Sequence, residues 1–111
     1  MLPFQKSMCL CLLQISLILF SNPSLSGSIP TQLGIMSSLE RLEMHETSLS
    51  GTIPTELGHL NNLETLLLHE TYVTGEMPEE VCSLTKLKNL EANCRGLSPM
   101  VRCSCCTKCE K

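Results

Sequence analysis

The chain has 111 residues and a formal net charge of -3 at pH 7, and its aromatic residues are one Tyr and two Phe. This length suits one domain, and the composition is that of a globular protein rather than a disordered one. Nucleic-acid binding is not expected, because affinity for a phosphate backbone depends on an excess of Lys and Arg on one face. With many leucines and few aromatic side chains, the core is expected to consist of similar layers.

The N-terminal segment, residues 1–26, admits two interpretations. Residues 1–6 carry one Lys, residues 7–20 are almost wholly apolar, and small residues follow at Ser24 and Ser26. This pattern is typical of a secretory signal peptide. Residues 13–19 equally fit a strand of the repeat that follows, so we define residues 1–14 as an apolar leader, which a cleaved signal would extend to about residue 26. The apolar run is shorter than the ~20 residues of a spanning helix, and no membrane anchor is expected.

A 24-residue repeat occupies residues 15–97, as about three copies and a partial fourth. Residues 39–62 and 63–86 are the two best copies, and an earlier, looser copy covers residues 15–38. Segments of the form Gly-x-x-Pro recur in phase, which is the signature of a repeat architecture. The glycines and prolines that mark the period are Gly27, Gly51, Gly75, Pro30, Pro54 and Pro78.

Each copy predicts a short strand followed by a loose coil. Leu39, Leu42 and Met44 follow the pattern L-x-x-L-x-L, whose alternation places Leu42 and Met44 on one face of a strand. The later apolar residues recur every three or four positions, and Gly51 supplies a turn in which positive φ costs little. One coil cannot bury its own apolar side, so the copies must stack.

The run L-x-x-L-x-L-x-x-N-x-L-x-G-x-I-P-x-x-L-G, which residues 39–60 follow at nearly every apolar position, resembles the plant-type, extracellular leucine-rich repeat. The resemblance implies an α/β solenoid, a right-handed coil with short parallel strands on its concave face and short helical or 3₁₀ segments elsewhere. It also implies a receptor-like or secreted protein that binds another protein or a cell-wall glycan through the concave face. The tail VRCSCCTKC resembles the cysteine-rich ending of algal repeat proteins of this kind.

Two features depart from this family's pattern. Thr47 and Thr71 occupy the position of the Asn whose side chain satisfies backbone groups at the bend, and a hydroxyl has less hydrogen-bonding capacity than an amide. In addition, Asn22 is one residue out of phase. We therefore expect a weaker ladder of side-chain hydrogen bonds and a distorted first coil.

Residues 98–111 are expected to form a cysteine-rich cap, because the last coil has no following coil to cover its apolar face. Six cysteines allow about fifteen pairings, and only a pair between the adjacent Cys105 and Cys106 is disfavoured. Zinc held by the four cysteines of residues 103–109 is an alternative, although only Cys106-x-x-Cys109 has a standard spacing. Free thiols are a third. The disulfide candidates are Cys82, Cys94, Cys103, Cys105, Cys106 and Cys109.

Side chains that alternate with the inward leucines are expected to form the partner-binding face. Since parallel strands lie ~4.8 Å apart, His45 should stack beside His69, with Glu46 and Glu70 near by. A metal-binding or proton-sensitive site is one interpretation of this pair, and duplication of surface residues by the repeat is the simpler one, so no metal or other cofactor is expected. The predicted binding residues are Arg41, Glu43, His45, Thr65, Leu67, His69, Asn89 and Glu91, and Asn93 follows them.

Enzyme activity and a small-molecule substrate are not expected. The sequence has no Ser-His-Asp arrangement in a supporting context and no Gly-rich phosphate loop. The consecutive Glu79 and Glu80 point in different directions, unlike a glycosidase pair, and His59 is expected in solvent on the convex side. Two hypotheses remain. The chain is a secreted module that binds a protein or glycan, or it is the terminal piece of a longer receptor-like repeat protein with a mainly structural, capping role.

Overall fold

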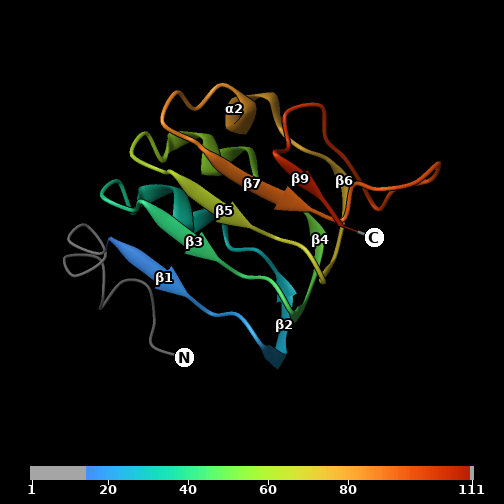
Figure 1. Cartoon of the computed structure of the whole chain (residues 1–111). Helices are drawn as coiled ribbons and strands as arrows, with labels where there is room; N and C mark the ends of the chain where they lie inside the picture. The colour runs from blue at the N-terminus through green and yellow to red at the C-terminus, as the bar shows by residue number, and fades with distance from the viewer. Residues whose placement is uncertain (1–14, 111) are drawn as a thin grey trace.

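The computed structural model describes residues 15–110, which form a solenoid with two parallel sheets (Figure 1). The five-stranded sheet has the order β1-β3-β5-β7-β9, and the four-stranded sheet has the order β2-β4-β6-β8. Short helical segments lie on the far side of the five-stranded sheet (Figure 1). In chain order the elements are β1 (Ser16–Ile18), β2 (Asn22–Ser28), the 3₁₀ helix η1 (Thr31–Ile35), β3 (Arg41–Glu43), β4 (Thr47–Thr52), the 3₁₀ helix η2 (Thr55–His59), β5 (Thr65–Leu67), β6 (Tyr72–Glu76), α2 (Glu79–Cys82), β7 (Asn89–Ala92), β8 (Val101–Arg102) and β9 (Lys108–Cys109).

The register of the five-stranded sheet follows the sequence period. Leu42 pairs with Leu66, and Leu66 pairs with Leu90. The step, meaning the difference in residue number between paired residues of neighbouring strands, therefore equals the period of the repeat in both cases. Between β1 and β3, however, Leu17 pairs with Leu42, and this step exceeds the period by a single position. The register between β2 and β4 also shifts between Asn22 and Ser26. The irregularity predicted for the first coil is therefore present, and β2 accommodates it.

The core consists of stacked apolar side chains, one set from each coil. The repeat leucines Leu39, Leu42, Leu63 and Leu66 have an exposed fraction of 0%. Burial of a leucine side chain contributes ~1.5–3 kcal/mol relative to an exposed one. Because equivalent leucines lie on neighbouring coils, each coil completes the burial of the next one, as a solenoid requires.

Two glycines let the helical segments pack closely. A Cβ atom on Gly34 would lie 2.4 Å from the Glu56 carbonyl oxygen, and one on Gly58 would lie 2.5 Å from the Glu80 Cβ. Neither approach is compatible with a side chain, so glycine is required wherever one coil's helical segment meets the next. At the turn, Gly51 has a φ of 78°, in agreement with the conformation expected there.

The two threonines satisfy the backbone at the bend. The Thr47 hydroxyl donates to the Met44 carbonyl oxygen at 2.9 Å and accepts from the Leu49 amide at 3.5 Å. Thr71 repeats this arrangement with the Leu68 carbonyl oxygen at 2.7 Å and the Val73 amide at 3.3 Å. A single hydroxyl thus reaches one acceptor and one donor, which is the role that the family's Asn position implied.

Disulfides staple the C-terminal segment, as predicted. Cys82 of α2 pairs with Cys105, Cys94 pairs with Cys109, and Cys103 pairs with Cys106. All six candidates are therefore bonded to one another, so none of them is left as a thiolate for the zinc alternative. The staples hold β9 beside β7 at a step shorter than the period, since Glu91 pairs with Lys108. The last coil is therefore shorter than the others, and disulfide bonds hold it in place.

The leader assigned to residues 1–14 lies outside the described residues. Residues 16–18, which the signal-peptide interpretation also includes, form β1 and pair with β3. Within residues 15–110, no helix combines the length and apolar character needed to cross a membrane.

Candidate binding face

The outward side of the five-stranded sheet, here called the sheet face, presents its side chains in three columns. Strand alternation and the observed register assign every second residue of each strand to this face. The face includes all eight predicted residues. The first column is Ser16, Arg41, Thr65 and Asn89; the second is Ile18, Glu43, Leu67, Glu91 and Lys108; the third is Phe20, His45, His69, Asn93 and Glu110.

The predicted residues differ in how far they reach solvent. Arg41 and Asn89 are exposed, and Thr65, Leu67, His69 and Glu91 are half-buried. Glu43 and His45, which we expected to be open, have exposed fractions of 7% and 9%. The reason is local: Arg41 Nε donates a hydrogen bond to the Glu43 carboxylate, and the Phe20 ring stacks on His45.

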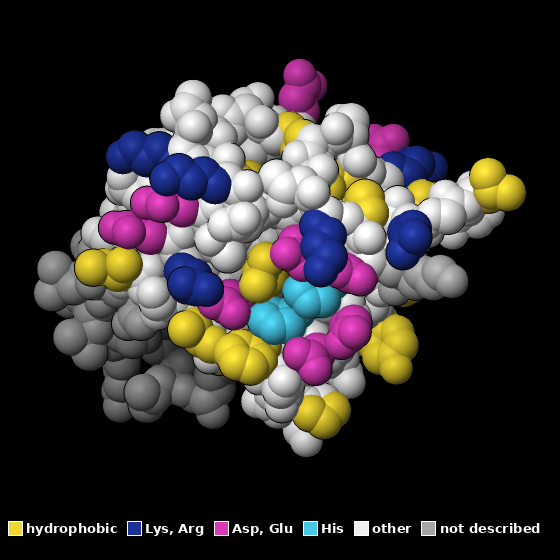
Figure 2. All heavy atoms as spheres, in the orientation of Figure 1, with side chains coloured by type: hydrophobic (Ala, Val, Ile, Leu, Met, Phe, Trp, Pro, Cys, Tyr) yellow, Lys and Arg dark blue, Asp and Glu magenta, His cyan; other side chains and the backbone are white. Residues whose placement is uncertain are grey.

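The third column contains a row of stacked rings, here called the aromatic row: Phe20, His45 and His69. The centroids of Phe20 and His45 lie 4.8 Å apart, and those of His45 and His69 lie 4.6 Å apart, which confirms the stacking expected of the two histidines. Figure 2 shows the two histidine side chains side by side, surrounded by acidic side chains. Phe20 was not predicted from the sequence, because Leu17 pairs with Leu42, one position more than the period, and this shift moves Phe20 out of the phase that aligns the histidines.

Each histidine of the aromatic row has an acidic neighbour. His69 Nδ1 lies 3.3 Å from a Glu91 carboxylate oxygen, and His45 Nε2 lies 3.6 Å from a Glu46 carboxylate oxygen. The Nδ1 atoms of both rings are buried; that of His45 has no hydrogen-bond partner among the described residues, and that of His69 contacts Glu91 without the geometry of a hydrogen bond. Among the described residues, no group of three or more His, Cys, Asp or Glu is arranged to hold a metal ion. In this part of the chain, the metal interpretation of the histidine pair therefore lacks a third ligand.

Two basic residues on the sheet face are paired with acidic ones. In the first pair, Arg41 contacts Glu43. In the second pair, Lys108 Nζ lies 2.9 Å from a Glu110 carboxylate oxygen. This hydrogen bond lowers the pKa of Glu110 and raises that of Lys108. Lys108 and Glu110 were not predicted on this face, because the pairing of Glu91 with Lys108 is shorter than the period and has no counterpart in the repeat.

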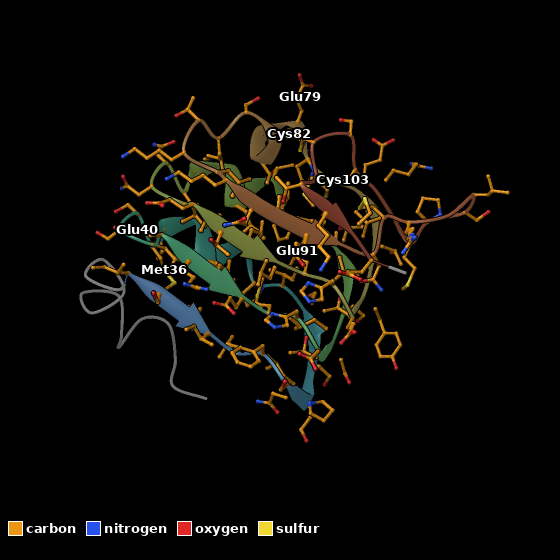
Figure 3. The ribbon with its side chains drawn as sticks, viewed as in Figure 1. Met36, Glu40, Glu79, Cys82, Glu91 and Cys103 are labelled. Atoms are coloured by element: carbon orange, nitrogen blue, oxygen red, sulfur yellow. A yellow bond between two sulfur atoms is a disulfide. The ribbon has the colours of Figure 1, made fainter. Side chains whose placement is uncertain are left out.

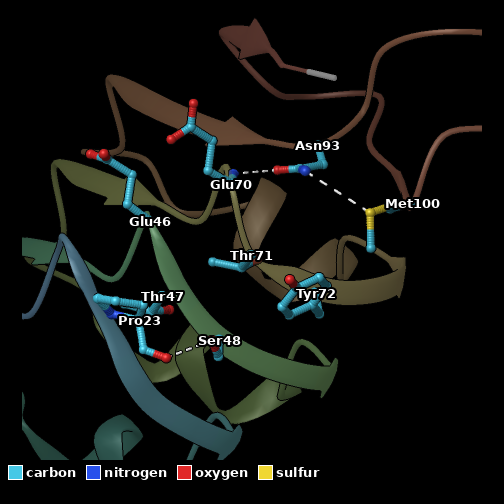
Figure 4. Close-up of a pocket in the computed structure, with 9 residues that line it drawn as sticks. All are labelled: Pro23, Glu46, Thr47, Ser48, Glu70, Thr71, Tyr72, Asn93 and Met100. Atoms are coloured by element: carbon cyan, nitrogen blue, oxygen red, sulfur yellow. Dashed lines mark hydrogen bonds between the residues drawn. The ribbon is translucent and has the colours of Figure 1, made fainter.

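A hollow of about 460 Å³, here called the side pocket, lies where the strands of the five-stranded sheet turn into the four-stranded sheet (Figure 4). Glu46 and Glu70 extend in the same direction from neighbouring turns (Figure 4). They hold equivalent repeat positions, with φ angles of 56° and 54°. The lining residues are Pro23, Glu46, Thr47, Ser48, Glu70, Thr71, Tyr72, Asn93 and Met100.

Glu79, Glu80 and His59, which the sequence did not place on the binding face, lie away from the sheet face. Glu79 and Glu80 are exposed and line a second, open hollow with Gly58 and Ser83. In Figure 3, Glu79 lies at α2, whereas Glu91 lies over the five-stranded sheet. His59 is exposed at the end of η2, as expected of a solvated residue.

The Leucine Rich Repeat family model matches residues 38–60. No curated protein matches the sequence. Among solved structures, the chain is similar to the LRR ectodomain of the plant membrane receptor kinase GASSHO1/SCHENGEN3 from Arabidopsis thaliana, solved in complex with CASPARIAN STRIP INTEGRITY FACTOR 2. The TM-score is 0.69 and the identity 31%, over 84% of this chain and 10% of that one.

Two further structures are similar. The plant peptide hormone receptor RGFR1, solved in complex with RGF2, gives a TM-score of 0.65 and 27% identity over 81% of this chain and 13% of that one. The ectodomain of the Arabidopsis thaliana receptor kinase SOBIR1 gives 0.63 and 27% over 69% and 41%. The chain thus spans between a tenth and about two fifths of these structures. With its parallel sheets, its periodic register and its stapled tail, the chain has a leucine-rich-repeat solenoid fold, similar to that of plant receptor ectodomains.

Proposed function

We propose that this chain is an extracellular interaction module that binds a protein or peptide segment across the sheet face. The observation that carries the proposal is the mixed character of that face: charged, polar, aliphatic and aromatic side chains alternate over five neighbouring strands. Protein interfaces have this composition, with apolar and aromatic groups near the centre and polar groups around them. The GASSHO1/SCHENGEN3 ectodomain was solved in complex with CASPARIAN STRIP INTEGRITY FACTOR 2 and the peptide hormone receptor RGFR1 in complex with RGF2, which supports the same use of the fold.

The residues proposed to make up the binding face are those predicted from the sequence: Arg41, Glu43, His45, Thr65, Leu67, His69, Asn89 and Glu91. Their roles differ. Thr65 and Asn89 stand in adjacent strands, where the Asn89 amide donates to the Thr65 hydroxyl at 3.3 Å, and they offer hydrogen bonds to a partner. Leu67 and the two more exposed rings of the aromatic row, Phe20 and His69, offer apolar contact. Glu43 and His45 are largely covered and hold their neighbours in position.

Three disulfides support an oxidising, extracellular location, because such bonds form and persist outside the reducing cytosol. The repeat fold of receptor ectodomains is an interaction fold, and the family match carries no enzyme activity. In the alternative, the chain has mainly a capping role at the end of a longer repeat array. In that case substitutions on the sheet face leave partner binding unchanged.

The test uses the full, oxidised chain as bait for proteins and glycans of the extracellular fluid, followed by affinity measurement with each purified partner. Thr65→Arg combined with Asn89→Arg places two bulky cations on the sheet face. The matched control is Thr55→Arg combined with Thr85→Arg, at exposed positions outside the five-stranded sheet. We expect the first variant to weaken binding at least ~10-fold, since a handful of central residues dominates most interfaces, and the control to leave it unchanged. Equal affinities for both variants contradict the proposal, and a partner of purely glycan nature contradicts its assignment to proteins.

A further inference from the structure

We propose that the side pocket receives an arginine side chain of the bound protein segment. This inference rests on the proposed function and names the chemistry of the partner. It starts from the charges around the pocket. The lining residues include two carboxylates, from Glu46 and Glu70, and no Lys or Arg. On the neighbouring sheet face, by contrast, Arg41 neutralises Glu43, and Lys108 neutralises Glu110. Glu46 also lies 3.6 Å from His45 Nε2, but no Lys or Arg among the described lining residues neutralises either carboxylate, so a cation from a partner could do so.

The two carboxylates lie close to each other because of the repeat. The Glu46 amide donates to the His69 carbonyl oxygen at 3.1 Å, so the Glu46 and Glu70 turns are directly adjacent. Parallel neighbours in a sheet lie ~4.8 Å apart. A guanidinium group is planar and presents five N–H donors in a rigid fork, and it can bond to two adjacent acceptors at once. An ammonium group, as a compact point charge, has no such directional match.

The pocket also has exposed apolar surface, which the apolar stem of a cationic side chain could cover and a hydrated ion could not. Tyr72 is 64% exposed and Met100 is 38% exposed, although both are large apolar side chains. An aromatic ring attracts a cation placed over its face, and guanidinium stacks on such rings better than ammonium does. The methylene groups of arginine would cover Met100, which lies beside Asn93 on the same side of the pocket. This combination of bare aromatic surface and two neighbouring carboxylates in one hollow distinguishes an arginine pocket from a merely solvated acidic patch.

Hydrogen bonds fix the walls of the pocket before any ligand arrives. The Ser48 hydroxyl donates to the Pro23 carbonyl oxygen at 2.6 Å, which joins the first two coils. On the opposite side, the Glu70 amide donates to Asn93 Oδ1 at 2.6 Å, which joins the third and fourth coils (Figure 4). A preformed site of this kind spends little of its interaction energy on ordering itself. The volume of about 460 Å³ falls within the ~300–1,000 Å³ of pockets that take small ligands.

The test titrates the full, oxidised, ¹⁵N-labelled chain with the peptide acetyl-Gly-Arg-Gly-amide and follows the backbone amide resonances. We expect the largest shifts at Glu46, Glu70 and Tyr72. Glu46→Gln combined with Glu70→Gln should weaken binding about 10-fold, and Tyr72→Ala about 3-fold. The matched control, Glu79→Gln combined with Glu80→Gln, removes the same charge at exposed positions away from the pocket and should bind like the unaltered chain.

Three results overturn the proposal. The first is that a peptide with citrulline, the neutral analogue of arginine, shifts the same resonances at the same concentrations. The second is a lysine peptide that binds as tightly as the arginine peptide. The third is equal weakening in the pocket variant and in the control, which would make net charge the cause. The spectrum of each variant reports its folding, and the citrulline and lysine comparisons on the unaltered chain decide the question if a variant does not fold.

This experiment is separate from the one on the sheet face. If the arginine peptide leaves the pocket resonances unshifted while the Thr65 and Asn89 variant still loses its partner, the proposed function stands and the arginine pocket falls. If the peptide binds in the pocket while that variant keeps its partner, the binding site lies at the pocket rather than across the sheet face.

Discussion

Replacement of Thr71 by valine tests whether the threonine at the bend performs the backbone-satisfying role. Valine has nearly the same shape but lacks the hydroxyl. Thr71 is 5% exposed, and its hydroxyl bonds to the Leu68 carbonyl oxygen and the Val73 amide. We expect Thr71→Val to lower the free energy of unfolding substantially, because both backbone groups would be left in the interior without this partner.

The magnitude follows from the two contacts. The 2.7 Å bond is a good one, with a net contribution of ~1 kcal/mol, while the 3.3 Å contact is longer and contributes less. A buried carbonyl or amide left without a partner costs a further ~1–3 kcal/mol. We therefore expect a total loss of ~2 kcal/mol, near the middle of this range.

Urea unfolding of the oxidised chain, followed by circular dichroism, measures this loss. The control is Thr74→Val, at an exposed position of β6, which should change the stability by less than ~0.5 kcal/mol. The midpoint should fall without a change in slope, because the surface exposed on unfolding is the same. A loss for Thr71→Val no larger than that of the control would refute the reasoning. Thr71→Asn, which restores the family's residue, should be at least as stable as the parent.

Three further predictions concern the cap, the helical side and acid stability. Replacing Cys82 and Cys105 by alanine opens the loop that this disulfide closes and should cost ~3 kcal/mol, measured by urea unfolding of the variant with its other disulfides intact. Gly58→Ala should lower the melting temperature by several degrees, since the new Cβ would meet the next helical segment at 2.5 Å; an unchanged melting temperature would mean that the segments separate freely. The pKa of Glu110 is lowered from 4.5 by Lys108, so its pairing stabilises the fold above that value and is lost as the pH falls through the lowered pKa. Glu110→Gln should therefore flatten the fall in melting temperature below pH 4.5, and an identical pH profile for both proteins would show that the pair contributes nothing.

The regular part of the fold could be predicted from the sequence because each coil buries the same repeat positions in the same way. The alternation at Leu42 and Met44 and the spacing of the repeat determine which side chains point inward and which strands are neighbours. The stacking of His45 on His69 followed from the same spacing. The sequence also indicated a disulfide cap, although it left the pairing open.

The remaining features depend on contacts between segments that the period does not relate. Phe20 joins the aromatic row through the irregular first step, and Lys108 reaches the sheet face through the shortened last step. The side pocket combines residues from three repeats and from the partial fourth with Met100 of the tail. Burial of Glu43 was not predicted either, because it depends on the rotamer by which Arg41 covers it.

One backbone feature bears on how such a protein diverges. At Ser21, Glu46 and Glu70 the chain takes a left-handed conformation, with φ between 54° and 56°, at the corner between the two sheets. The conformation belongs to the corner rather than to the residue type, since a serine and two glutamates adopt it alike. Side chains at this corner can therefore change from one repeat to the next without altering the leucine core. Under the function proposed above, binding specificity and folding stability are encoded by different positions of the same repeat, and selection can act on one while it leaves the other in place.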